Sequence, residues 1–267
     1  MDKGIYVGNG LDYYEDLPWL VEKGFTAFVI GGDLESIKNK IQYATQWEVK
    51  TTIVDIAGGN WKSIVDAVDS KYYYHDEPYL YKVPESLLIE KLDYIKRERP
   101  NSKFVIGDIR VIQYWKYKPI NNLYYTYTSY TDNWYLPLLG IAIPIGLGNQ
   151  SPSIKRIHKR VNGKIPFIWV YGQNKLLCHP DEYHKLRKTC DKLDIDLMIL
   201  YLGDGLGKYE FNAISEEQLL INIDHFLNDT KPYTTSQWWQ RLNERLRLSI
   251  NHLIKTKNFK EFIEKLF

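Results

Sequence analysis

The feature that most constrains this chain is a regular alternation of short apolar runs with amphipathic helical patterns. Eight runs rich in β-branched and aromatic residues, each followed by Gly, Asp, Asn or Ser, predict strands. Between most of them, apolar residues recur every three or four positions, as in a helix with one buried face. The expected strands cover residues 5–7, 25–30, 51–54, 72–74, 104–106, 123–127, 167–170 and 197–200.

Strands that are continuous apolar runs, separated by one-faced helices, indicate a parallel sheet covered by helices. Eight such units match a (β/α)₈ TIM barrel, which typically has about 250 residues. A doubly wound open sheet is the alternative, but the turn after the first strand lacks its dinucleotide-binding glycine pattern. We therefore expect an α/β TIM barrel over residues 1–230 and a helical C-terminal extension over residues 231–267. Two units are less regular, because 111–122 has little helical period and 133–164 is a long connection.

Composition excludes several classes of function. Lys and Arg number 35 against 33 Asp and Glu, so there is no long-range field for nucleic acid. Two cysteines and six scattered histidines form no metal-binding pattern, and we expect neither a metal nor a cofactor.

The longest apolar run covers residues 136–147 and is broken by Pro137, Gly140 and Pro144. It is too short to span a bilayer, which needs about 20 residues, and we expect a buried or partner-facing loop. No signal peptide is visible, so we expect a soluble chain that is cytoplasmic or part of a larger assembly. An oligomer or assembly contact is expected through residues 136–147 or 232–267.

Acidic residues gather where the predicted strands run into their loops, which is where functional side chains lie in such barrels. Acids crowded together bind cations or carry out proton chemistry. Helix capping is the simpler explanation for Asp33 and Asp55. The seven carboxylates at these positions are Asp33, Asp55, Asp76, Glu77, Asp108, Asp132 and Asp204.

The fourth unit differs from the others, because His75-Asp76-Glu77-Pro78 follows three tyrosines. Here the sequence resembles the large clan of (β/α)₈ glycoside hydrolases whose fourth strand ends in Asn-Glu-Pro. The resemblance implies that Glu77 is the general acid/base. It also implies that Asp76 takes the place of the Asn that contacts the sugar 2-hydroxyl. It covers the barrel layout in outline and this tripeptide in detail.

The seventh predicted strand departs from that clan, whose nucleophile is a second Glu at its end. Gln173 stands near that position here, and Gln cannot form the glycosyl-enzyme ester of a retaining mechanism. Another carboxylate is one explanation, with Asp204, Asp108 and Asp132 as candidates in that order. The reaction would then be inverting, with the two carboxyls about 6.5–9.5 Å apart. The other explanation is a site that binds sugar without cutting it.

Three hypotheses follow from these residues. The first is a glycoside-hydrolase-like barrel that acts on an oligo- or polysaccharide, with Glu77 as proton donor and Asp204 or Asp108 as catalytic partner. The second is a non-catalytic carbohydrate-binding or structural barrel, and the third is a phosphate-ester enzyme that uses acids and Mg²⁺. Aromatic residues are abundant and suit a sugar-binding cleft. The predicted substrate-binding residues are Asn9, Asp76, Tyr130, Asp132, Trp169, Tyr171 and Gln173.

Overall fold

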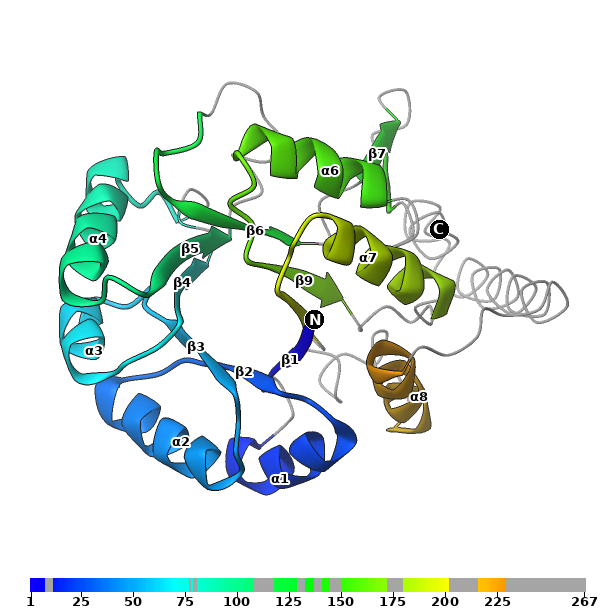
Figure 1. Ribbon diagram of the computed structural model, residues 1–267, viewed down its shortest axis with the longest axis horizontal. Coiled ribbons are helices and arrows are strands. Elements are labelled where there is room, and N and C mark those ends of the chain that lie inside the picture. Colours follow the sequence, from blue (N-terminus) through cyan, green and yellow to red (C-terminus); the bar gives the residue numbers. More distant parts are fainter. Residues whose placement is uncertain are drawn as a thin grey trace, which may run out of the picture.

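The computed structural model describes residues 1–7, 12–76, 78, 81–107, 118–128, 133–136, 141–144, 150–171, 180–201 and 216–228. Eight parallel strands close into a barrel, and helices surround it (Figure 1). The (β/α)₈ barrel predicted from the alternation is therefore confirmed. The barrel strands are β1 (Asp2–Tyr6), β2 (Ala27–Ile30), β3 (Thr51–Asp55), β4 (Tyr72–Asp76), β5 (Lys103–Gly107), β6 (Tyr124–Thr128), β9 (Phe167–Tyr171) and β10 (Leu197–Tyr201). Their order around the barrel is β1-β10-β9-β6-β5-β4-β3-β2.

The helices lie between the strands, as the apolar stripes predicted. Helix α1 contains Pro18, which cannot donate a hydrogen bond to the carbonyl of Tyr14. The hydroxyl of Tyr43, on α2, donates to that carbonyl instead at 2.8 Å, so the interruption is satisfied from outside the helix. The helices are α1 (Tyr13–Lys23), α2 (Leu34–Gln46), α3 (Trp61–Ala67), α4 (Glu85–Glu98), α6 (Gln150–Arg160), α7 (Pro180–Lys192) and α8 (Glu216–Leu227).

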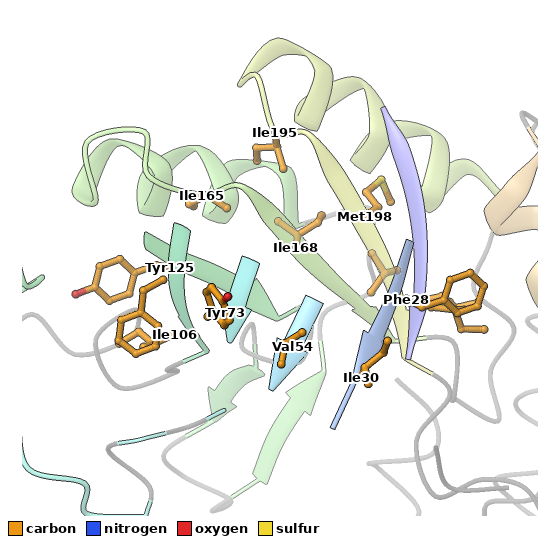
Figure 2. Close-up of a cluster of buried hydrophobic side chains, with 14 of the residues drawn as sticks. Phe28, Ile30, Val54, Tyr73, Ile106, Tyr125, Ile165, Ile168, Ile195 and Met198 are labelled. Carbon is orange, nitrogen blue, oxygen red and sulfur yellow. The ribbon is translucent and has the colours of Figure 1, made fainter. Parts of the chain in front are cut away.

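Two hydrophobic layers result from the alternation of side chains along each strand. One lies between the barrel and its helices and includes Phe28, Val54 and Tyr73 (Figure 2). The other fills the barrel interior and is rich in aromatic rings. Its buried members are Ala27, Val29, Ile53, Tyr72, Tyr74, Val105, Phe167, Trp169, Leu197 and Ile199.

The long sixth connection contains a hairpin where the sequence predicted a loop. Strands β7 (Asn133–Leu136) and β8 (Ile141–Pro144) pair in antiparallel fashion outside the barrel. Part of the apolar run 136–147 is therefore strand, and its role as a contact stays a prediction. The expected C-terminal extension, residues 231–267, lies outside the described residues. Among the helices that the structure describes, none has the length and apolar character needed to cross a bilayer.

Candidate functional site

The carboxyl ends of β3 and β4 bring two acids to the same end of the barrel. Asp55 and Asp76 are the last residues of these strands, each two positions beyond an interior residue, Ile53 and Tyr74. The period of two directs both side chains toward the barrel mouth. In the strand register, Asp55 lies beside Tyr74 and Asp76 beside Gly107. This is the end where barrel enzymes carry their functional groups.

A tyrosine from the barrel interior holds Asp76. The hydroxyl of Tyr74 donates to Oδ1 of Asp76 at 2.6 Å. Burial, followed by the negative charges of Asp76 and Asp55, raises the pKa of Tyr74 well above its usual value. Tyr74 therefore stays protonated and remains a donor. Because Asp76 itself is exposed, the result is a fixed carboxylate that faces the mouth of the barrel.

Asp55 is half-buried, and its environment differs from that of a helix cap. Its Oδ1 accepts a hydrogen bond from the backbone N–H of Ala57 at 2.8 Å, whereas the cap of α3 is Asn60. The expectation that Asp55 caps the following helix is therefore wrong. Burial raises the pKa of Asp55, and the charge of Asp76 raises it further, against the opposing Ala57 hydrogen bond and Lys91. For Asp33 the expectation is confirmed, since it accepts from Ser36 N–H at 2.8 Å and begins α2.

A buried histidine and lysine lie behind these acids, in the layer between barrel and helices. The Nδ1 atom of His75 is 3.2 Å from Nζ of Lys91. An ammonium group can only donate, so Nδ1 of His75 accepts and its proton is on Nε2. Burial, together with the charge of Lys91, lowers the pKa of His75 from 6.5 to about 4. His75 is therefore neutral at physiological pH.

The low pKa of His75 gives a prediction for stability against pH. The unfolded chain binds a proton near pH 6.5, whereas the folded chain does not until about pH 4. Stability is therefore lost as the pH falls through this window, by up to about 3 kcal/mol. Urea unfolding between pH 7 and pH 4 measures this loss. His75→Gln keeps an acceptor for Lys91 but does not titrate, so its curve should fall less steeply; parallel curves would contradict the prediction.

Aromatic rings form the floor of the mouth. The ring of Trp169 packs against those of Tyr74, Tyr201 and Tyr6, with centroids 5.5, 6.1 and 6.2 Å away. Trp169 is only 6% exposed, and its indole N–H makes no hydrogen bond of normal geometry. It lies close enough to the Tyr74 hydroxyl to oppose slightly the rise in the pKa of Tyr74.

The predicted site residues are thus only partly placed. Asp76 and Trp169 lie at the mouth and both contact Tyr74, and Tyr171 ends β9. The sequence did not point to Lys91, although a lysine inside an apolar helix stripe was the available signal. Within the described ranges, no three His, Cys, Asp or Glu side chains are grouped to hold a metal ion. The predicted residues outside the described ranges are Asn9, Glu77, Asp108, Tyr130, Asp132, Gln173 and Asp204.

No protein-family model and no curated protein matches this sequence. Solved structures do share its fold. A glycoside hydrolase family 5 enzyme from Prevotella bryantii, in complex with a xyloglucan tetradecasaccharide, matches with a TM-score of 0.53 at 12% identity, over 84% of this chain and 95% of that one. A tri-modular endo-β-1,4-glucanase of the same family from Bacillus licheniformis gives a TM-score of 0.51 at 12% identity, over 85% of this chain. The chain spans 59% of the length of that glucanase.

A D-psicose 3-epimerase, in the presence of D-fructose, matches about as well. Its TM-score is 0.52 at 9% identity, over 86% of this chain and 96% of that one. The likeness therefore extends to proteins with different reactions, and it shows a common barrel rather than a common activity.

Proposed function

We propose that this barrel binds an oligo- or polysaccharide at its carboxyl-terminal mouth and cleaves a glycosidic bond, with Glu77 as the proton donor. The observation that carries the proposal is the hydrogen bond from Tyr74 to Asp76. It fixes a carboxylate at the very end of β4, one residue before Glu77. That is the position in which the resembling glycoside hydrolases place a sugar-binding side chain next to their acid.

The chemistry required of each residue suits this arrangement. A general acid must hold its proton near neutral pH, and a negative charge beside a carboxyl favours its protonated form. Asp76 directly precedes Glu77 in the sequence. Asp76 is exposed and can accept a hydrogen bond from a sugar hydroxyl. The rings of Tyr6 and Tyr201 offer apolar faces for a sugar ring.

The second carboxylate then acts as a base that activates water in an inverting reaction. Asp204, Asp108 and Asp132 remain candidates from the sequence, and Asp55 joins them from its place at the end of β3. Its raised pKa, held down in part by Lys91, fits a group that exchanges protons.

A second candidate function is carbohydrate binding without cleavage. It is favoured by one observation, the presence of Gln173 rather than a Glu shortly after β9. The same carboxylates and rings would then serve as a binding surface.

The test is reducing-end release from a panel of glycans by the purified full chain, with binding to each glycan measured by calorimetry. The panel starts with β-1,4-glucans and xyloglucan, because the structural neighbours named above include enzymes of that class. Release of reducing ends establishes a glycosidase. Binding without release supports the second function, and neither binding nor release across the panel overturns both.

A further inference from the structure

We propose that Lys91 is a positioning residue that joins the ends of β3 and β4 and thereby sets the placement and charge of Asp55 beside Asp76. Its consequence for turnover rests on the proposed function, but the positioning itself does not. Lys91 lies on α4, outside the barrel.

The hydrogen bonds of Lys91 reach both strand ends at once. Its Nζ donates to the backbone carbonyl of Ile56 at 2.6 Å, and Ile56 directly follows Asp55. The same Nζ lies 3.2 Å from Nδ1 of His75, which directly precedes Asp76. One ammonium group therefore ties together the residues next to both carboxylates. In the register of the sheet the two strands are already neighbours, and Lys91 fixes the point where their pairing ends.

Lys91 is buried, so other groups must offset the cost of removing its positive charge from water. It is 1% exposed, and burying an ammonium group is costly unless acceptors and an opposite charge offset the loss of water. Burial lowers the pKa of Lys91 to about 8, while Asp55 and Glu90 oppose that change. The groups that face Lys91 are Asp55 on β3, neutral His75 on β4, the ring of Trp61 on α3 at 5.5 Å, and Glu90 on its own helix.

The attraction between Lys91 and Asp55 is reciprocal. The positive charge of Lys91 opposes the rise in the pKa of Asp55 that burial and Asp76 produce. Without that charge, Asp55 would keep its proton to higher pH, whereas a lysine that only fills space would leave its titration unchanged. The titration of Asp55 therefore distinguishes a positioning role from a purely structural one.

The experiment follows the Asp55 carboxyl by ¹³C NMR in the full chain, with the signal assigned by its loss in Asp55→Asn. Lys91→Met keeps the length of the side chain and removes the charge. The midpoint for Asp55 should rise in this variant, because the positive charge that favours the ionised carboxyl is gone. Lys62→Met is the matched control, because the Lys62 ammonium is half-exposed on α3 and pairs with Glu90. An unchanged Asp55 midpoint in folded Lys91→Met overturns the proposal.

Wild type provides a measurement that needs no variant, in case Lys91→Met does not fold. The Asp55 signal should show a second step near pH 8, as Lys91 loses its proton. A flat signal through that range also overturns the proposal. Lys91→Arg keeps the charge and should remove the step, because Arg stays protonated there.

Turnover gives a separate readout. Where a glycan is cleaved, Lys91→Met should move the acidic limb of the kcat/KM profile to higher pH, and Lys91→Arg should largely restore it. If no glycan is cleaved, the proposed function fails, but the NMR titration still decides the role of Lys91.

Discussion

Glu77→Gln is expected to slow the hydrolysis of a glycan that the wild type cleaves by about 10²- to 10⁴-fold, which is the usual contribution of a general acid. The amide has nearly the same shape as the carboxyl but cannot deliver a proton to the departing oxygen. The loss should therefore appear in kcat, with binding of the glycan retained. Single-turnover kinetics together with calorimetry separate the two.

The matched control for this variant is Glu22→Gln, since Glu22 is exposed on α1, away from the carboxyl ends of the strands. Its turnover should equal that of the wild type. A Glu77→Gln protein that cleaves as fast as Glu22→Gln would remove Glu77 from the mechanism.

Asp76→Asn is a second test of Glu77 as the acid. It changes Asp76-Glu77-Pro78 to the Asn-Glu-Pro pattern of the glycoside hydrolases that this sequence resembles. It also removes the negative charge that precedes the proposed acid, and such a charge favours the protonated form of a neighbouring carboxyl. A general acid is active while protonated, and the alkaline limb of the kcat/KM profile should therefore move to lower pH. A limb that does not move would mean that another group donates the proton.

The barrel could be predicted from the sequence because the apolar patterns that specify its strands and helices are local. Each strand is a short apolar run, and each helix has apolar residues along one face. A chain that alternates eight such strands with helices can adopt few architectures. The apolar pattern of helix α1 contains Pro18, and the hydrogen bond from Tyr43 that compensates for this proline comes from a residue far along the chain. No local pattern contains that contact.

The site was harder to predict because it depends on register between strands. Asp55 and Asp33 look alike in sequence, each at the end of a strand and before a helix. Only the structure shows that Asp33 caps α2 while Asp55 is held by Ala57 and faces Asp76. The role of Lys91 is equally hard to predict from the sequence, because its partners Ile56 and His75 lie at the ends of two different strands.

Strand register also decides the effect of a substitution at Gly107. Gly107→Ala is expected to lower the free energy of unfolding by about 1–3 kcal/mol, as overpacking does. Gly107 ends β5 beside Asp76. A Cβ atom there would overlap the Tyr74 hydroxyl and lie 3.1 Å from Cζ of Tyr74 and 3.2 Å from Oδ1 of Asp76. Tyr74 has little room to yield, because its ring packs against Phe167 and Trp169. Urea unfolding at pH 7 measures the loss.

Gly31→Ala is the matched control at the end of β2. Its Cβ would meet Cβ and Oδ2 of Asp55 at 3.6 and 3.8 Å, which is ordinary contact, so its stability should stay close to that of the wild type. Equal losses in the two variants would contradict the steric argument.

A double variant then tests whether the effect of Gly107→Ala passes through the Tyr74 hydroxyl. Tyr74→Phe removes the oxygen that the new methyl group would strike, at the cost of its hydrogen bond to Asp76. If the two residues interact as described, the double variant should be more stable than the sum of the single losses predicts, by about 0.5–3 kcal/mol. Additive losses would mean that the methyl group displaces the backbone of β5 instead. A clear coupling would show that the missing side chain at position 107 lets Tyr74 hold Asp76 at the mouth of the barrel.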